Sequence, residues 1–129
     1  MLEFSIQGIR VKINLNPGVY AMNNKSAIGK TRLGVLLGKY FFSGGVTFYY
    51  SYDDYVRGMK LADVLEKRDY SVVMIDRLDM FIQEYSIFED VDKYRDKTIF
   101  LFDLKNVFVC CSNLKFCNVV MSEREIEVR

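Results

Sequence analysis

The chain has 129 residues, enough for one hydrophobic core, and we expect residues 1–129 to form a single domain. Hydrophobic residues make up 50% and charged residues 27% of the sequence, a balance that excludes a disordered chain. With 18 basic and 17 acidic residues the net charge is +1, so the overall positive field that favours binding to nucleic acid is missing.

The sequence shows no signal for export or membrane insertion. Its first residues alternate and include Glu3, whereas a signal peptide opens with basic and then apolar residues. No apolar run approaches the ~18 residues that a membrane-spanning helix needs. Cys110, Cys111 and Cys117 form an odd set without any histidine to complete a metal site, so we interpret them as buried strand cysteines in a reducing environment. We therefore expect a cytoplasmic protein without membrane contact.

The first third of the chain predicts strands followed by a helix. Hydrophobic and polar residues alternate over residues 4–15 on either side of Gly8, which is typical of an antiparallel strand pair with a turn or bulge at that glycine. Residues 16–18 interrupt the pattern, and residues 19–22 read as a buried strand. Apolar residues at helical spacing follow over residues 33–41.

The rest of the chain alternates strands and helices and then ends on strands. A helix capped by Asp53 or Asp54 is expected to reach about Lys67. Further strands are expected at residues 46–52, 70–76, 98–102, 108–111 and 118–128, with an irregular helical stretch at residues 78–97. This order predicts an α/β fold in which a mixed sheet has a parallel centre and antiparallel edge strands.

Residues 19–33 are the most informative about function. An apolar strand, a turn of small polar residues and a helix are the three parts that a phosphate-binding loop needs. Residues 24–31 match the pattern G-x-x-x-x-G-K-[ST] except at the first position, where asparagine replaces glycine and still tolerates positive φ. The predicted nucleotide-binding residues are Asn24, Lys25, Ser26, Ala27, Ile28, Gly29, Lys30, Thr31 and Arg32.

Two of these residues, together with Asp76 further along the chain, have expected roles. Lys30 would contact the β and γ phosphates, and the hydroxyl of Thr31 would bind Mg²⁺. Asp76 ends an apolar strand, and it would hold the same ion through water if its strand lies beside the strand that leads into the loop. The alternative is an ordinary strand-to-helix turn with a chance Gly-Lys-Thr.

With these motifs the chain resembles a shortened P-loop NTPase, and its opening strand pair with the following residues 16–21 is similar to the start of ABC-type ATPase domains. The resemblance covers about Glu3 to Asp76, and residues 98–103 fit the next core strand. It implies a three-layer P-loop-like fold with helices on both faces of the sheet, and ATP or GTP with Mg²⁺ as the ligand. The lack of an N-K-x-D-type guanine motif favours ATP.

Departures from the family bear on catalysis. Arg77 stands where ABC-type enzymes have their catalytic glutamate, and the sequence has neither an LSGGQ-like segment nor a histidine switch. Asp79 and Glu84 remain as candidates to polarise water, with surface solvation as the alternative for both. We therefore expect hydrolysis to be weak or absent without a partner.

Two more groups of polar residues are candidates for the nucleotide rim. Arg32 and Arg77 would add positive charge there, or would be solvated arginines. Related folds place a residue that senses the γ phosphate after the next core strand, in the region of Asp103, Lys105 and Asn106.

The aromatic run at residues 46–55 is relevant to partners. Asp53 and Asp54 beside it disfavour stacking on nucleic-acid bases, so strand packing with some exposed tips is the default and a protein partner or homo-oligomer is the functional option. An alternative function follows: a P-loop-like protein-binding module without nucleotide chemistry, by analogy an inhibitor of a bacterial host system encoded by a phage or mobile element.

Overall fold

The computed structural model describes residues 1–22, 27–76, 87–103 and 114–129, and within them the strands form two sheets. The strands are β1 (Leu2–Ile6), β2 (Ile9–Ile13), β3 (Gly18–Met22), β4 (Thr47–Tyr50), β5 (Val72–Ile75), β6 (Ile99–Phe102), β7 (Lys115–Cys117), β8 (Val119–Met121) and β9 (Glu125–Val128). The helices are α1 (Ala27–Phe42), α2 (Tyr52–Val56), α3 (Leu61–Lys67) and α4 (Phe88–Tyr94).

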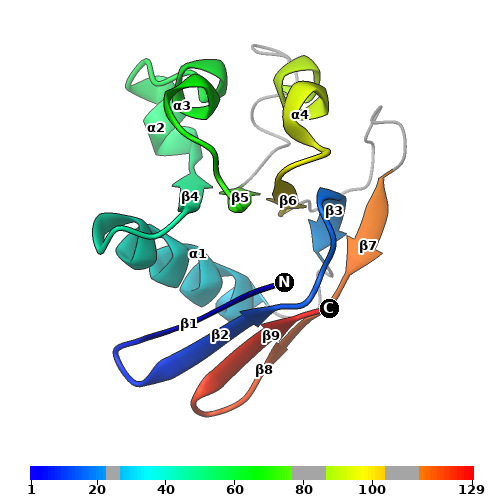
Figure 1. Ribbon diagram of the computed structural model, residues 1–129. Coiled ribbons are helices and arrows are strands. Elements are labelled where there is room, and N and C mark those ends of the chain that lie inside the picture. Colours follow the sequence, from blue (N-terminus) through cyan, green and yellow to red (C-terminus); the bar gives the residue numbers. More distant parts are fainter. Residues whose placement is uncertain (23–26, 77–86, 104–113) are drawn as a thin grey trace.

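The larger sheet is parallel throughout, with the strand order β4-β5-β6-β3-β7. From β3 the chain crosses through α1 to β4 at the far edge, and then returns through β5 to β6, which lies beside β3 (Figure 1). Parallel strands are connected with a right-handed crossover. Because the direction of travel reverses at β4, α1 and the later helices lie on opposite faces of the sheet.

Both faces of the parallel sheet are buried, as the alternation of side chains shows. On β5 and β6, Val73 and Phe100 belong to the cluster that includes α3 and α4, whereas Val72 and Leu101 belong to the cluster that includes α1. All four residues of β5 and all four of β6 are buried. The expectation of central strands covered on both sides is therefore confirmed for residues 72–75 and 99–102.

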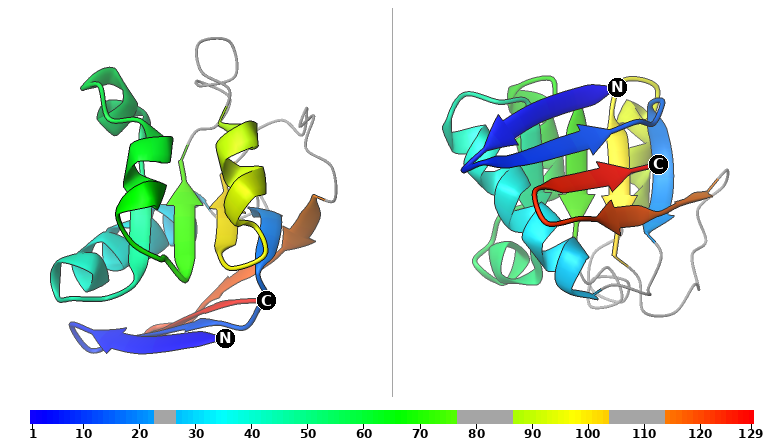
Figure 2. Two further views of the ribbon diagram at one scale, coloured as in Figure 1. Left: turned by 45° about the horizontal axis from the view of Figure 1, so that its top comes forward. Right: turned by 90° about the horizontal axis from the view of Figure 1, so that it is seen from below.

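The smaller sheet has the order β1-β2-β9-β8 and brings the two ends of the chain together. It lies against the α1 side of the molecule, as the view from below shows (Figure 2). The strand pair β1 and β2 is antiparallel around Gln7 and Gly8, both with positive φ, as expected for a two-residue hairpin turn. The smaller sheet buries its inner face, where Val11, Ile13 and Ile126 are fully buried in the same cluster as residues of α1.

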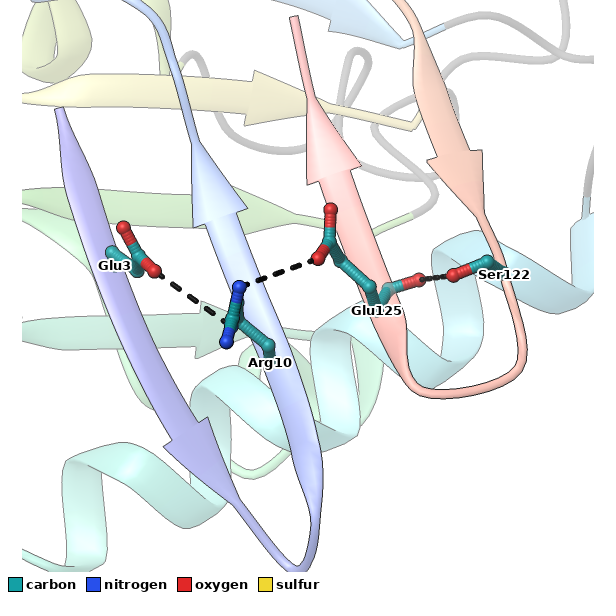
Figure 3. Close-up of polar contacts among 4 residues, drawn as sticks. All are labelled: Glu3, Arg10, Ser122 and Glu125. Atoms are coloured by element: carbon teal, nitrogen blue, oxygen red, sulfur yellow. Dashed lines mark hydrogen bonds and ion pairs between the residues drawn. The ribbon is translucent and has the colours of Figure 1, made fainter.

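Ion pairs on the outer face link three strands of the smaller sheet. The guanidinium of Arg10 on β2 lies 3.8 Å from a carboxylate oxygen of Glu3 on β1 and 3.8 Å from one of Glu125 on β9 (Figure 3). The hydroxyl of Ser122 also donates to the backbone carbonyl of Glu125. Exposed pairs of this kind contribute about 0–1 kcal/mol each, so the buried inner face dominates the stability of this sheet.

Two fold expectations are wrong in detail. The antiparallel strands are not edges of the parallel sheet, whose outer strands β4 and β7 both pair in parallel, but belong to the separate smaller sheet. The single helix expected to begin at Asp53 or Asp54 is two helices. Ser51 is the N-cap of α2, Asp54 completes its capping box, and Gly58 with φ of +91° separates α2 from α3.

Within the described part of the chain, no helix combines the length and apolar character that crossing a membrane requires. The strand expected at residues 108–111 lies outside the described residues.

Candidate functional site

Polar side chains gather at the carboxyl edge of the parallel sheet. Asp76 directly follows β5, Asp103 directly follows β6, and Lys30 lies near the start of α1, the helix that follows β3. In parallel α/β sheets, ligands bind outside the carboxyl ends of the strands, near the point where the strand order reverses. The three residues therefore lie where such a fold places a ligand.

Lys30 and Asp103 form the best-defined contact at this edge. The Nζ atom of Lys30 lies 3.2 Å from Oδ1 of Asp103, and the lysine is only 3% exposed. A buried ammonium needs a charged or polar partner, because losing water without one costs several kcal/mol. Asp103 is itself held in place, since its backbone N–H donates to the carbonyl of Ile75. The charge of Lys30 is thus fixed between the ends of the central strands.

Asp76 has a partner on the neighbouring strand. The hydroxyl of Tyr49, on β4, donates to Oδ2 of Asp76 over 2.8 Å, and the backbone N–H of Asp76 donates to the carbonyl of Tyr50. Burial raises the pKa of the Tyr49 hydroxyl well above its ordinary value, and the hydrogen bond to Asp76 raises it further. The negative charge of Asp103 acts in the same direction, so both carboxylates lie near this hydroxyl. Tyr49 therefore remains a proton donor at physiological pH.

Cys117 borders the site from the other side. It pairs in register with Met22, the last residue of β3, and it is 2% exposed. Burial raises the pKa of its thiol to about 12, and the charge of Lys30 acts in the opposite direction. The interpretation of Cys117 as a buried strand cysteine is confirmed, while Cys110 and Cys111 lie outside the described residues.

The predicted phosphate-binding residues are only partly described. Asn24, Lys25 and Ser26 lie outside the described residues. The described members all belong to α1: its first residues are Ala27 and Ile28, followed by Gly29, Lys30, Thr31 and Arg32. Thr31 is exposed and Arg32 is half-buried.

The other predicted site residues divide in the same way. The candidates for water activation, Asp79 and Glu84, lie outside the described residues, as do Arg77, Lys105 and Asn106. Asp76 and Asp103 are among the described residues, and both lie at the carboxyl edge of the parallel sheet.

The strand of Asp76 does not lie directly beside the loop-bearing strand. β6 pairs with both β3 and β5 and separates them. The carboxylate that follows the strand next to β3 is therefore Asp103. Because β6 and β3 are neighbours, Asp103 lies close enough to Lys30 for a direct contact. Sequence reasoning could identify Asp103 because it follows an apolar run, the same signal that identified Asp76.

Tyr49 is the residue that sequence reasoning missed. It lies within an aromatic run interpreted as strand packing, and no local signal distinguishes it from Tyr50. Tyr50 is fully buried, and its hydroxyl donates to the carbonyl of Met59. The two tyrosines face opposite sides of β4, as strand alternation requires, and only the side of Tyr49 faces Asp76.

Tyr49 also lines an apolar groove. The groove has a volume of about 490 Å³ and is lined by Gly38, Phe41, Phe42, Phe48, Tyr49, Asp54, Met59, Val64, Lys67 and Tyr70. The side chain of Phe42 at its rim is 88% exposed.

Among the described residues, no group of three or more acidic, cysteine or histidine side chains gathers to hold a metal ion. Comparison with protein-family models, with curated proteins and with solved structures finds no match for this chain.

Proposed function

We propose that this chain is a P-loop-type nucleotide-binding protein whose ligand is ATP or GTP with Mg²⁺. The observation that carries the proposal is the placement of Lys30. Its ammonium is buried near the start of the helix that follows β3, at the carboxyl edge of a parallel sheet and within 3.2 Å of Asp103. The sequence around Lys30 fits the phosphate-loop pattern at every fixed position except Asn24.

The phosphates would bind at the start of α1. This helix has 16 residues and no acidic residue in its first turn, so its positive end is not neutralised by a side chain on the helix itself. Lys30 adds a full positive charge at the same end. A bound phosphate would take over the role that Asp103 has in the described structure, as the anionic partner of the Lys30 ammonium.

The residues present fit a Mg²⁺ ion that is shared with the nucleotide. Mg²⁺ prefers hard oxygen ligands, keeps several waters and needs one or two carboxylates besides the phosphates. Thr31 and Asp76 would supply a hydroxyl and a carboxylate. Because β6 separates the strand of the loop from the strand of Asp76, Asp76 would hold the ion through a water ligand. The ion would neutralise charge on the phosphates.

We propose that hydrolysis is weak or absent without a partner. Arg77 directly follows Asp76, where the ABC-type enzymes that the chain resembles have a water-activating glutamate. Asp79 and Glu84 remain as candidates to polarise water. Purified protein incubated with Mg-ATP should accordingly release phosphate slowly or not at all, even when it is saturated with nucleotide.

The second candidate is a protein-binding module that keeps this type of fold without nucleotide chemistry. The exposed side chain of Phe42, beside the apolar groove, favours it, because large apolar groups at a concave surface are typical of interfaces. In this case nucleotide would not bind. Inhibition of a bacterial host system would then be one role to test.

Thermal melting with and without Mg-ATP or Mg-GTP separates the two candidates. Ligand at a hundred times its dissociation constant stabilises the folded state by about 2.7 kcal/mol, which raises the melting temperature by several degrees. Lys30→Met keeps the aliphatic stem and removes the charge, so the shift should disappear in this variant. The absence of any shift of the unaltered protein at millimolar nucleotide would rule out the proposed function.

A further inference from the structure

The side chain of Tyr49 makes two contacts at the hydroxyl-bearing end of its ring. Its hydroxyl donates to Oδ2 of Asp76, the residue after β5. Its ring packs against α1 at Gly34, where a Cβ atom would lie only 2.8 Å from two ring carbons. Tyr49 therefore connects β4, helix α1 and the carboxylate of Asp76.

These contacts join two parts of the proposed site. α1 is the helix that includes Lys30 and Thr31, and Asp76 is the carboxylate expected to hold the ion through water. Packing of the Tyr49 ring on Gly34 fixes the distance between α1 and the hydroxyl, and the hydroxyl in turn fixes the orientation of the carboxylate. Carboxylates that bind metal ions are commonly oriented by such hydrogen bonds, and removal of the donor weakens metal binding.

We propose that Tyr49 is the positioning residue that orients Asp76 towards a nucleotide-bound Mg²⁺ ion. This inference rests on the proposed function, because it concerns the same site. The competing explanation is that the hydrogen bond only joins β4 to β5 and adds stability. That explanation predicts a loss of stability without any change in how Mg²⁺ acts on nucleotide binding.

The test is Tyr49→Phe, which keeps the ring against Gly34 and removes the donor. Binding of ATP is titrated at a series of Mg²⁺ concentrations and also with EDTA. We expect the Mg²⁺ concentration for half-maximal enhancement of ATP binding to rise about tenfold, while the affinity for ATP in EDTA stays unchanged. If ATP affinity changes only in the presence of Mg²⁺, the substitution acts on binding of the ion.

Tyr20→Phe is the matched control. The hydroxyl of Tyr20, on the loop-bearing strand β3, donates to the backbone carbonyl of Asn16 over 2.8 Å, so this variant also loses one tyrosine hydrogen bond but no bond to a carboxylate. Its Mg²⁺ dependence should equal that of the unaltered protein. Chemical denaturation of both variants shows how much each loses in stability.

The outcomes separate this inference from the proposed function. If Tyr49→Phe and Tyr20→Phe show the same Mg²⁺ dependence as the unaltered protein, while Lys30→Met abolishes ATP binding, the positioning role is wrong and the nucleotide site stands. If ATP binding is weakened equally with Mg²⁺ and with EDTA, Tyr49 acts on the nucleotide rather than on the ion, and the inference is again overturned. If the unaltered protein binds no nucleotide, both fail.

Discussion

The pair formed by Lys30 and Asp103 has two consequences for single residues. The ammonium of Lys30 is almost completely buried, so Asp103 stabilises the folded protein by compensating its charge. The same carboxylate occupies the place where a phosphate would contact the lysine. On the proposed function, stability of the free protein and affinity for nucleotide would oppose each other at Asp103.

Asp103→Asn should accordingly tighten nucleotide binding while it destabilises the free protein. Removal of the competing negative charge is expected to lower the dissociation constant about tenfold, which corresponds to about 1.4 kcal/mol. The midpoint of urea denaturation without ligand should decrease, because a buried charge loses its ionic partner. Calorimetric titration with Mg-ATP and a denaturation curve measure the two effects.

Asp69→Asn, at an exposed position, is the control and should change neither quantity. Weaker binding of Mg-ATP to Asp103→Asn would contradict the competition between Asp103 and phosphate. It would mean instead that this carboxylate assists binding of the nucleotide or its ion.

The buried thiol of Cys117 gives a prediction on reactivity. The reactive form is the thiolate, and burial raises the pKa of this thiol to about 12. In a variant with serine at positions 110 and 111, iodoacetamide at pH 8 should label Cys117 slowly in the folded protein and rapidly in urea. Fast labelling of the folded protein would contradict the burial of this strand end.

The raised pKa of Cys117 also predicts how stability depends on pH. The folded state disfavours the thiolate, so the stability that the neutral thiol contributes is intact below the ordinary thiol pKa of ~8.5. It is lost as the pH rises towards 12, the pKa in the folded state. The free energy of unfolding should therefore fall less steeply over this range in Cys117→Ala, as urea denaturation at a series of pH values will show.

Helix α1 contains two glycines that differ in what surrounds them, and they provide a test of its packing. A Cβ atom at Gly34 would lie 2.8 Å from the ring of Tyr49, whereas a Cβ atom at Gly38 would meet nothing within 4 Å. Gly34→Ala should therefore destabilise the protein by about 1–3 kcal/mol through overpacking. Gly38→Ala should stabilise it by up to about 1 kcal/mol, because alanine favours the helix.

Urea denaturation of the two glycine variants measures this difference directly. Because both substitutions add one methyl group to the same helix, intrinsic helix propensity cancels between them. Equal stabilisation by both would show that the ring of Tyr49 does not pack against α1 at Gly34.

At the level of helices and strands, the sequence was most informative where hydrophobic patterns are strong and local. Runs of apolar residues predicted β5 and β6, and the alternation around Gly8 predicted the hairpin of β1 and β2. The helical segment after Ser51 was less predictable, because its interruption at Gly58 depends on a single backbone conformation. Asp53 or Asp54 was expected as the N-cap, but both lie within the first turn of α2, and Ser51 accepts the capping hydrogen bond from Asp54.

For the whole molecule, the pairing of strands could not be derived from the sequence. Alternation shows which side chains are buried but does not identify the neighbouring strand. β2 pairs with β9 from the opposite end of the chain, and this parallel pairing creates the separate four-stranded sheet. The position of β6 between β3 and β5 likewise could not be derived from the sequence.

The candidate site was predictable to the extent that it follows a motif. The phosphate-loop pattern identified Lys30 and Thr31, the end of an apolar strand identified Asp76, and the resemblance to related folds pointed to the region of Asp103. The partners of these residues were not predictable. Contacts from Lys30 to Asp103 and from Tyr49 to Asp76 connect residues that are distant in sequence, and they exist only because the strands are parallel and in this order.

The most direct test of the central claim, that Lys30 belongs to a nucleotide-binding site, is calorimetric titration of the purified protein with Mg-ATP and with Mg-GTP. The same titrations are repeated with Lys30→Met, whose fold is verified by circular dichroism. We expect saturable binding of at least one nucleotide to the unaltered protein and loss of this binding in the folded variant. Absence of binding to the unaltered protein, or equal binding by the variant, would contradict the claim.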